Sequence, residues 1–355
     1  MTQKTIETVE TPAVLIDEGV ARRNITRYQA YCDEHDLALR PHIKTHKLPH
    51  FAKLQMEAGA VGITCQKMSE AEAMADGGLE DILITYNILG AAKRERLRLL
   101  AERVPRLAVT VDNAVTVRGL SETFAASGKP LPVLIECNTG ADRCGVATPQ
   151  DALALARMVS DSPGLMLRGL MTYPPVGGGA AVAAFMGAAK ALLEDAGLAC
   201  DVISSGGSPD MWTASAEAGV TEYRIGTYIY NDRSLVTRGV CTWDDCALSV
   251  LTTVVSTPAS GRAIVDAGSK TLTSDLFSLT GHGHVLGHDD VSVARLSEEH
   301  GTLEWDGGDR FAIGERIRIV PNHVCVVSNM VDQVWLIGAD GGLAPYAVAA
   351  RGGIT

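Results

Sequence analysis

The chain has 355 residues, of which 46% are hydrophobic and 21% charged, as in a globular protein with one large domain or two modest ones. Its net charge of −11 argues against a general nucleic-acid-binding surface, because non-specific affinity depends on Lys and Arg neutralising phosphates. No apolar run reaches the roughly 18 to 20 residues that a membrane-spanning helix needs. The first residues lack the apolar core of a signal peptide. We therefore expect a cytoplasmic protein that binds neither nucleic acid nor membrane, with its eight cysteines mostly free thiols.

Strand-like runs alternate with helical patterns over the first two thirds of the chain. The runs are rich in β-branched residues and nearly continuously apolar, as strands buried on both faces of a parallel sheet are. The predicted strands are residues 11–17, 38–46, 59–66, 81–87, 106–112, 131–138, 164–173, 199–207 and 220–230. Helices are predicted between them, for example over 21–35, 91–103 and 150–159.

The number of strands favours one architecture. Without the first strand, eight remain, which is the number that a closed (β/α)₈ barrel needs. The rival fold, an open doubly wound sheet, normally has a glycine-rich phosphate loop after an early strand, and none is present here. After about residue 235 the strands alternate apolar and polar residues and turns separate them, which predicts an antiparallel β domain. We therefore expect a barrel over residues 21–235 and a β domain over residues 236–355.

The segment Arg-Pro-His-Ile-Lys-Thr-His-Lys, residues 40–47, contains the first candidate catalytic residue. Lys44 lies near the carboxyl end of the first barrel strand, which is the end where barrel active sites are built. A lysine inside an otherwise apolar strand has to be paired or used covalently. The alternative is a solvated lysine just past the end of the strand, and position alone leaves both interpretations open.

Two glycine-containing segments follow the last two barrel strands. They are Ser-Ser-Gly-Gly-Ser at residues 204–208 and Arg-Ile-Gly-Thr at residues 224–227. Barrels often bind phosphate through these two loops, and glycine lets the backbone approach the anion closely. One such segment is usually only a turn. Together with Lys44, the two predict a phosphorylated carbonyl cofactor that is held by protein at one end and joined to lysine at the other, as pyridoxal phosphate is.

His323 and Cys325 form a candidate metal site in the β domain. They are two residues apart in a strand-like run, so both side chains should point to one face. An imidazole and a thiolate suit Zn²⁺, with water or substrate completing the coordination. The alternative is a buried cysteine beside a hydrogen-bonded histidine. The histidines at 282, 284 and 288 fit a loop better than a set of ligands.

With these features placed, the chain resembles the D-threonine aldolase and D-serine dehydratase family. The resemblance extends from TPAVLID through RPHIKTHK, CNTGADRCGV, SSGGS and EYRIGTY to DAGSK and PNHVC, and so covers nearly the whole chain. This family combines an alanine-racemase-like barrel with a C-terminal β domain. The resemblance implies that residues 1–20 add a strand to the β domain. It also implies a homodimer, in which the β domain of one subunit helps to close the site of its partner.

The resemblance implies a role for each candidate residue. Lys44 would hold pyridoxal phosphate covalently and act as the base at the substrate Cα. Arg143 would contact the side of the cofactor that carries its 3-oxygen, and Arg224 would face the pyridine nitrogen. Tyr173 would touch substrate or cofactor, or simply cap the barrel. The phosphate would be held by Ser205, Gly206, Gly207, Gly226 and Thr227, and a divalent metal, zinc before manganese or magnesium, by His323 and Cys325.

The expected reaction begins with a D-3-hydroxy amino acid. Cleavage of the Cα–Cβ bond would give glycine and an aldehyde, as in a D-threonine aldolase, and this is the activity we expect first. Loss of the hydroxyl group would give a keto acid and ammonia, as in a D-serine dehydratase. Family aldolases tend to carry His-x-Asp at the metal and dehydratases His-x-Cys, so Cys325 favours the second outcome. The segment Tyr-Pro-Pro at 173–175 departs from the histidine-bearing substrate segments of both branches.

Two further classes stay open. An amino-acid racemase would use the same barrel and Lys44, with a tyrosine base from the partner, and would not need His323 or Cys325. A non-catalytic carrier of pyridoxal phosphate would be a bare barrel, so the β domain argues against that class.

Overall fold

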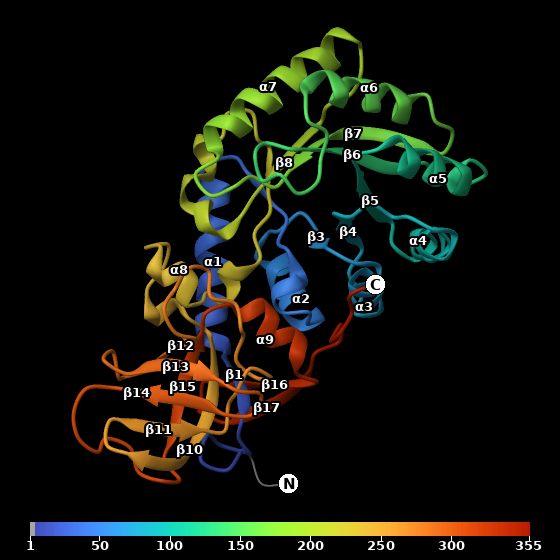
Figure 1. Ribbon diagram of the computed structural model, residues 1–355. Coiled ribbons are helices and arrows are strands. Elements are labelled where there is room, and N and C mark those ends of the chain that lie inside the picture. The colour runs from blue at the N-terminus through green and yellow to red at the C-terminus, as the bar shows by residue number, and fades with distance from the viewer. Residues whose placement is uncertain (1–3) are drawn as a thin grey trace. The chain divides into compact units, whose positions relative to one another are not determined.

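The computed structural model describes residues 4–355 and divides into two compact units, each described here by itself. The barrel unit contains Arg27–Lys44, Leu48–Gly226 and Gly353–Thr355. The β unit contains the residues up to Thr26, Thr45–Lys47 and Thr227–Gly352. Figure 1 labels most of the elements of both units.

Eight parallel strands form the sheet of the barrel unit, in the order β2-β9-β8-β7-β6-β5-β4-β3. An isolated parallel bridge between His42 and Thr64 joins the two ends of the sheet, and Thr64 N donates to Pro41 O at 2.7 Å. The predicted (β/α)₈ barrel is therefore confirmed. The strands are β2 (Ala38–Leu39), β3 (Ile63–Cys65), β4 (Asp81–Ile84), β5 (Arg106–Val111), β6 (Leu131–Cys137), β7 (Leu165–Thr172), β8 (Val202–Ser205) and β9 (Glu222–Tyr223).

Helices follow most of these strands and bury one apolar face each. In α6, for example, Thr148 caps the first turn by accepting from Asp151 N, and Ala152, Leu155 and Val159 are buried. Figure 1 shows α6 and α7 side by side along β7. The helices are α1 (Glu18–Glu34), α2 (Pro49–Ala58), α3 (Met68–Asp76), α4 (Ala91–Arg103), α5 (Ala114–Phe124), α6 (Pro149–Ser160) and α7 (Gly179–Asp195), with a 3₁₀ segment at Ser208–Ala216.

Four predicted barrel strands have less than half of their expected length, namely those over residues 38–46, 59–66, 199–207 and 220–230. In two of them a turn replaces part of the strand. The prediction over residues 38–46 is wrong after Leu39, because Pro41 has no N–H to donate and the chain turns into a 3₁₀ helix at Ile43–Thr45. The prediction over residues 220–230 is wrong outside Glu222–Tyr223, since another 3₁₀ turn forms at Thr227–Ile229. Lys44 therefore lies in a turn past the strand and not inside it.

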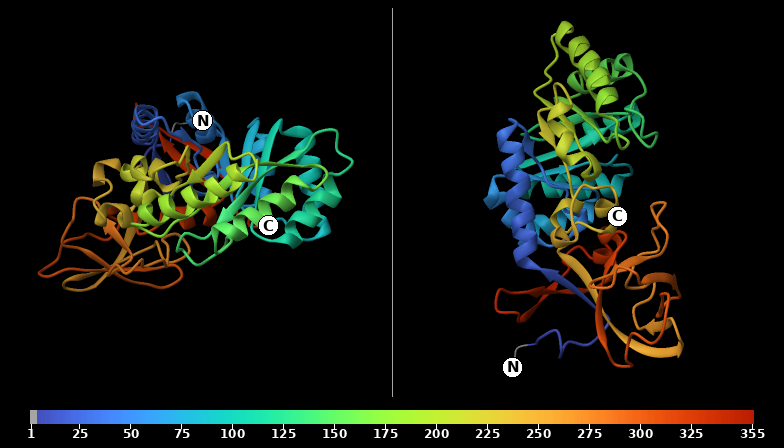
Figure 2. Two further views of the ribbon diagram at one scale, coloured as in Figure 1. Left: turned by 90° about the horizontal axis from the view of Figure 1, so that it is seen from above. Right: turned by 90° about the vertical axis from the view of Figure 1, so that its left-hand side faces the viewer.

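A nine-stranded, mainly antiparallel sheet forms the β unit, as the alternating pattern predicted. Its order is β11-β14-β13-β12-β15-β10-β1-β16-β17, and the first strand lies between β10 and β16. Figure 2 shows the long β10 curving through this sheet. The strands are β1 (Ala13–Asp17), β10 (Leu248–Ala259), β11 (Arg262–Val265), β12 (Gly283–Val285), β13 (Ser292–Leu296), β14 (Gly301–Glu304), β15 (Arg316–Pro321), β16 (Gln333–Ile337) and β17 (Leu343–Ala347), with helices α8 (Arg233–Thr237) and α9 (Val324–Met330) and a 3₁₀ turn at Trp243–Asp245.

The expected strand through His323 and Cys325 is wrong. Strand β15 ends at Pro321, His323 is the N-cap of α9, and Cys325 lies in the first turn of that helix. The run Val-Cys-Val-Val favours a strand by its β-branched residues. A contact from a distant part of the chain starts the helix instead, because Oδ2 of the fully buried Asp232 accepts from Val324 N at 3.3 Å.

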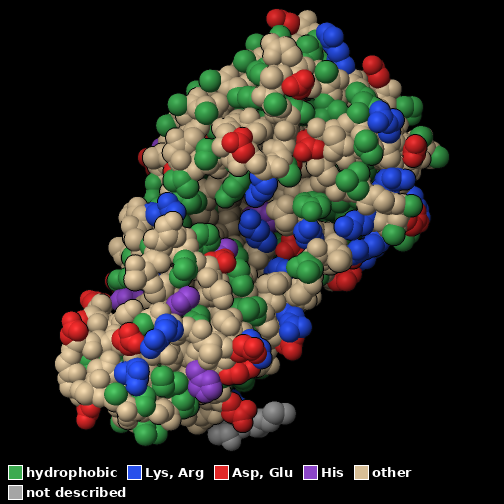
Figure 3. All heavy atoms as spheres, in the orientation of Figure 1, with side chains coloured by type: hydrophobic (Ala, Val, Ile, Leu, Met, Phe, Trp, Pro, Cys, Tyr) green, Lys and Arg blue, Asp and Glu red, His purple; other side chains and the backbone are tan. Residues whose placement is uncertain are grey.

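Acidic and basic side chains are interspersed on the face of the molecule in Figure 3. Among residues 4–355, no helix is both long and apolar enough to cross a membrane.

Candidate functional site

A histidine at the carboxyl end of β2 holds the turn that carries Lys44. Nδ1 of His42 accepts from Lys44 N at 3.3 Å, and Nε2 lies 3.2 Å from Oε1 of Gln66. Gln66 in turn donates from Nε2 to Thr85 O at 2.8 Å, so the ends of three neighbouring strands fix this turn. Lys44 is half-buried, and its Nζ makes no hydrogen bond or ion pair within the described part of the chain. Such an amine suits a covalent role, as expected of the lysine that holds pyridoxal phosphate.

The loop after β8 has the geometry of an anion-binding turn. Gly206 has φ +147°, and a Cβ there would lie 2.0 Å from Arg224 O, so the close approach of β8 and β9 requires glycine. Oγ of Ser205 is fully buried and has no hydrogen bond of normal length, although the Glu217 carboxyl group lies near it. A buried hydroxyl without a partner beside a glycine turn fits a phosphate group.

Tyr173 lies beside this loop. A Cβ at Gly207 would be 3.8 Å from Cε2 of Tyr173, so the tyrosine ring and the loop after β8 are neighbours. The guanidinium carbon of Arg143 lies 4.6 Å from the centre of the same ring, which is cation–π geometry. The structure thus brings together two residues that the sequence placed on separate loops. Both side chains are exposed, so both are accessible to a ligand.

The loop that carries Arg143 is folded tightly onto β6. Oδ1 of Asn138 accepts from Gly140 N at 3.0 Å and from Asp142 N at 3.1 Å. Gly145 N donates to Oδ2 of Asp112 at 3.0 Å. These contacts fix the backbone on both sides of Arg143, although its side chain remains exposed.

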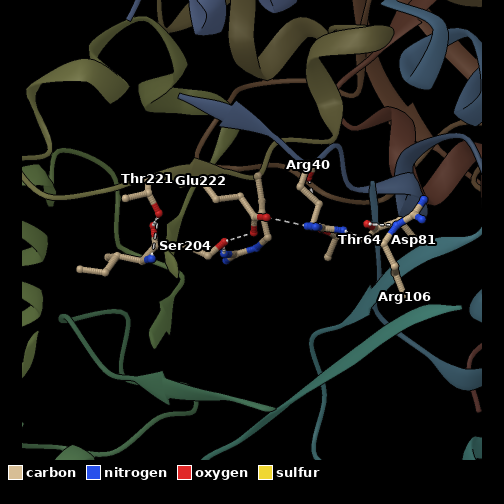
Figure 4. A network of polar contacts seen from close by, with 9 residues as sticks. Arg40, Thr64, Asp81, Arg106, Ser204, Thr221 and Glu222 are labelled. Carbon is tan, nitrogen blue, oxygen red and sulfur yellow. Dashed lines mark hydrogen bonds and ion pairs between the residues drawn. The ribbon is translucent and has the colours of Figure 1, made fainter. Parts of the chain in front are cut away.

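A chain of polar groups runs through the barrel interior from Asp81 through Arg40 and Glu222 to Ser204 (Figure 4), and Ser204 joins it to Arg224. Arg224 donates from Nη1 to Ser204 Oγ at 2.6 Å and from Nη2 to Thr172 O at 2.7 Å. Ser204 donates to Oε1 of Glu222 at 2.6 Å, and Oε2 of Glu222 accepts from Arg40 Nε, also at 2.6 Å. Arg40 then reaches Asp81, which also binds Arg106. Arg224 is therefore held rigidly at the carboxyl end of β9.

Burial and the neighbouring carboxylates shift the pKa values of these arginines in opposite directions. Burial lowers the pKa of Arg224, while Glu222 and Glu136 oppose the shift. Burial also opposes the charge of Arg40, but the carboxylates of Glu222 and Asp81 outweigh it and raise the pKa. Two buried cations are thus compensated by carboxylates inside one barrel.

Glu136 on β6 is a candidate functional residue that the sequence reasoning missed. Its side chain is 6% exposed, and burial raises its pKa, helped by Asp112 and opposed by Arg224 and Arg143. The signal was present in the sequence, because a carboxylate inside the apolar run Leu-Pro-Val-Leu-Ile-Glu-Cys is rare in a strand buried on both faces. A raised pKa close to two arginines is typical of functional sites.

In the β unit, His323 and Cys325 lie close together despite the helix. Nδ1 of His323 lies 2.6 Å from Oδ2 of Asp275, which leaves Nε2 for another partner. Sγ of Cys325 is 3.2 Å from Thr45 Oγ1 and 3.7 Å from Thr227 Oγ1. Burial opposes the charge of His323, but a hydrogen bond with Cys325 and the carboxylates of Asp275 and Asp232 outweigh it and raise the pKa to about 9.

These two side chains fit a divalent metal as a pair of ligands. Imidazole nitrogen and thiolate sulfur are a donor set that zinc prefers, and the Asp275 carboxylate behind the imidazole is typical of metal-binding histidines. Across residues 4–355, no group of three or more His, Cys, Asp or Glu side chains is arranged to hold a metal. Water or substrate would complete the coordination.

The predicted site residues of the barrel unit all follow carboxyl ends of strands. Lys44 follows β2, Arg143 follows β6 and Tyr173 follows β7. The remaining members of this set lie at the ends of β8 and β9 and are Ser205, Gly206, Gly207, Arg224 and Gly226. Parallel strands present these ends on one face of a barrel. Thr227, His323 and Cys325 belong to the β unit. The individual roles of these residues stay predictions.

Comparison with known proteins identifies the family. The model "Alanine racemase, N-terminal domain" matches residues 16–234, and "Putative serine dehydratase domain" matches residues 247–337. D-threonine aldolase of Arthrobacter sp. is 34% identical over 94% of this chain and 93% of its own. The chain belongs to the D-threonine aldolase and D-serine dehydratase family. Members of this family are pyridoxal-phosphate-dependent lyases, and so is this enzyme.

Solved structures support the same assignment. The crystal structure of D-threonine aldolase from Filomicrobium marinum is 33% identical, covers 100% of both chains and has a TM-score of 0.90. D-threo-3-hydroxyaspartate dehydratase from Delftia sp. HT23 is 32% identical, covers 97% of this chain and 99% of its own, and also has a TM-score of 0.90. A cysteine-to-alanine mutant of D-threo-3-hydroxyaspartate dehydratase, similar to the same degree, was solved in a metal-free form.

Proposed function

We propose that this enzyme is a metal-assisted lyase of D-3-hydroxy amino acids that cleaves the Cα–Cβ bond to give glycine and an aldehyde. The observation that carries the proposal is the amine of Lys44, unpartnered in the described structure, at the carboxyl end of the barrel. Its position matches the covalent attachment that pyridoxal phosphate needs, and barrel active sites are built at this end.

The barrel residues would bind and orient the cofactor. Pyridoxal phosphate, joined to Lys44, supplies an electron sink for charge that develops at the substrate Cα. The Ser205 hydroxyl and the backbone N–H groups of the loop after β8 suit its phosphate group. Arg224, held by Ser204 and Thr172, presents a fixed cation, and Arg143 with Tyr173 offers an exposed cation and ring to substrate or cofactor.

His323 and Cys325 would hold the divalent metal, through Nε2 and Sγ. Zinc is the cation that fits this donor pair best, before manganese or magnesium. The metal would supply Lewis acidity towards the 3-hydroxyl oxygen of the substrate. The hydroxyl groups of Thr45 and Thr227 can each donate a hydrogen bond to Sγ of Cys325, which stabilises negative charge on sulfur.

Carbon–carbon cleavage is supported by the 34% identity to a D-threonine aldolase over nearly the whole chain. The second candidate is dehydration to a keto acid and ammonia. One observation favours it, namely the thiol of Cys325 in the metal pair. D-threo-3-hydroxyaspartate dehydratase, a similar protein, was solved as a cysteine-to-alanine mutant in the metal-free form. A racemase would need neither His323 nor Cys325.

A parallel product assay tests the proposal. Zinc-loaded enzyme is incubated with D-threonine, D-serine and D-threo-3-hydroxyaspartate, and glycine, aldehyde, keto acid and ammonia are measured together. Glycine and acetaldehyde from D-threonine support the aldolase. Keto acid and ammonia from any substrate establish the dehydratase instead. L-allo-threonine from D-threonine, or L-serine from D-serine, formed at a rate unchanged by chelation, would contradict both and support a racemase.

We also propose that the enzyme acts as a homodimer on a small D-amino acid, in the cytoplasm. The proposal rests on the resemblance of the chain to its family, and light scattering of the purified protein tests the dimer directly.

A further inference from the structure

The loop between β11 and β12 holds His323 from one side. Oδ2 of Asp275 accepts from Nδ1 of His323 at 2.6 Å. The ring of Phe277 lies with its centroid 4.8 Å from the His323 ring at an angle of 60°. One residue of this loop thus binds the imidazole edge, and another packs against the imidazole ring. Asp275 lies 48 positions from His323 in the chain, so only the fold brings the pair together.

This loop is itself anchored to the strand end that precedes His323. Nδ2 of Asn322, which is fully buried, donates to Asp275 O at 3.1 Å and to Gly281 O at 2.9 Å. Arg233 donates from Nη1 to Oδ1 of Asn322 at 3.0 Å and from Nη2 to Thr280 O at 2.9 Å. Asn322, the residue before His323, therefore holds the loop backbone at Asp275 and at Gly281.

The middle of the loop adopts a backbone conformation that needs such support. Phe277 has φ +48° and Ser278 has φ +65°, both in the left-handed region that residues other than glycine rarely adopt. Such conformations persist where surrounding contacts hold them, and they cluster at functional sites. The contacts of Asn322 and Arg233 are the support seen here.

We propose that Asp275 is a positioning residue for metal binding by His323. A neutral imidazole has one N–H and one nitrogen with a free lone pair. In the neutral ring that a metal binds, the carboxylate of Asp275 requires the N–H at Nδ1, so the lone pair lies on Nε2. The same hydrogen bond fixes the orientation of the ring. This inference rests on the proposed metal role of His323 and Cys325 and adds the residue that prepares one of the two ligands.

Zinc affinity tests the inference without any measurement of activity. The dissociation constant of Zn²⁺ is measured on protein loaded with pyridoxal phosphate, by competition with a chromophoric chelator. Asp275→Ala and the isosteric Asp275→Asn are each compared with the unsubstituted protein. We expect both to bind Zn²⁺ about 10- to 100-fold more weakly, since outer carboxylates at metal-bound histidines contribute on this scale. Asp275→Glu, which keeps the carboxylate, should recover part of the affinity.

Asp289 provides a matched control. Its Oδ1 lies 3.6 Å from Nε2 of His284, so it is also a carboxylate beside a histidine of the β unit. Asp289→Ala should leave zinc affinity unchanged within about 2-fold. The metal-free melting temperature and the bound pyridoxal phosphate should be the same in all variants, which separates a loss of positioning from a loss of folding.

The outcomes separate this inference from the proposed function. If His323→Ala and Cys325→Ala lose zinc while Asp275→Ala and Asp275→Asn bind it normally, the metal site stands and the role of Asp275 is wrong. If neither His323→Ala nor Cys325→Ala changes zinc binding, the proposed metal site itself is wrong, and the inference is overturned with it. Weaker binding in both Asp275 variants, with Asp289→Ala unaffected, supports the inference.

Discussion

Nε of Arg40 lies 2.6 Å from Oε2 of Glu222 inside the barrel, with both side chains almost fully buried. The second oxygen of the same carboxylate accepts from Ser204, whose hydroxyl also accepts from Arg224. One carboxylate therefore compensates two buried arginines, one of them a candidate cofactor residue. Since charge without a partner is costly in a protein interior, Glu222 should be central to stability.

Glu222→Gln is expected to destabilise the protein by about 3 to 5 kcal/mol, because it leaves Arg40 and Arg224 buried without this countercharge. Urea unfolding of the variant and of the unsubstituted protein measures the difference in the free energy of unfolding. Glu102→Gln is the control, since it removes an exposed partner 2.5 Å from Arg98 and should lower the free energy of unfolding far less. Equal losses of stability in the two variants would show that the buried network stabilises the protein no more than a surface ion pair does.

Adjacent glycines in the loop after β8 should respond differently to alanine. Gly206→Ala forces φ +147° on an alanine and places its Cβ 2.0 Å from Arg224 O, so we expect a loss of more than about 1 kcal/mol and much weaker pyridoxal phosphate binding. Gly207→Ala meets no atom closer than 3.8 Å and should retain the stability of the unsubstituted protein. Thermal melting and cofactor titration measure both effects. A Gly206→Ala protein as stable as Gly207→Ala would contradict the close contact between β8 and β9.

Lys44→Ala should abolish both the visible absorbance of the bound cofactor and the lyase activity. The amine is the only group proposed to join the cofactor covalently, and loss of a catalytic base alone typically costs roughly 10²- to 10⁴-fold in rate. Lys53→Ala, which changes an exposed lysine of α2, is the control. An unchanged visible spectrum in Lys44→Ala would rule out this lysine as the attachment point.

Cys325→Ala should lose bound zinc and lyase activity together and keep pyridoxal phosphate. The thiolate supplies one of only two protein ligands, so the remaining imidazole binds the metal too weakly to survive dialysis. Metal content by mass spectrometry, cofactor absorbance and product formation are measured on one preparation. Cys200→Ala, a half-buried cysteine of the barrel unit, should leave all three unchanged. Full activity of unsubstituted enzyme after exhaustive chelation would refute the metal requirement.

The barrel could be predicted from sequence because its strands are continuous apolar runs of the expected number. The positions of Lys44 beyond β2 and of Ser205 at the end of β8 followed from the same reasoning, since both lie on the carboxyl side of barrel strands. Helix α9 could not be predicted, because its first turn depends on Asp232, which lies 92 positions from Val324. Asp275 was missed for the same reason, as nothing near it in the sequence indicates a histidine partner. The local sequence pattern predicts the helices and strands. Contacts between residues far apart in the sequence decide how the proposed metal ligands are arranged.

Glu136 should make the protein less stable at neutral pH than a neutral residue would. Burial raises its pKa above the ordinary value of 4.5, with Asp112 adding to the shift and Arg224 and Arg143 only partly opposing it. A carboxyl group with a raised pKa in the folded state contributes stability below pH 4.5, and that contribution is lost as the pH rises through the raised value. Glu136→Gln should therefore melt at a higher temperature than the unsubstituted protein at pH 7. The difference in melting temperature between the two proteins should disappear as the pH falls towards 4.5.

Melting temperatures of Glu136→Gln between pH 4.5 and pH 8 measure this dependence. Glu80→Gln is the control, because Glu80 is exposed and its substitution should give no gap that changes with pH. A Glu136→Gln protein that melts lower at pH 7 would mean that attraction to Arg143 and Arg224 outweighs burial. If the variant is more stable but less active, the buried carboxylate is retained for function, because its charge lowers stability and so cannot be kept for that purpose.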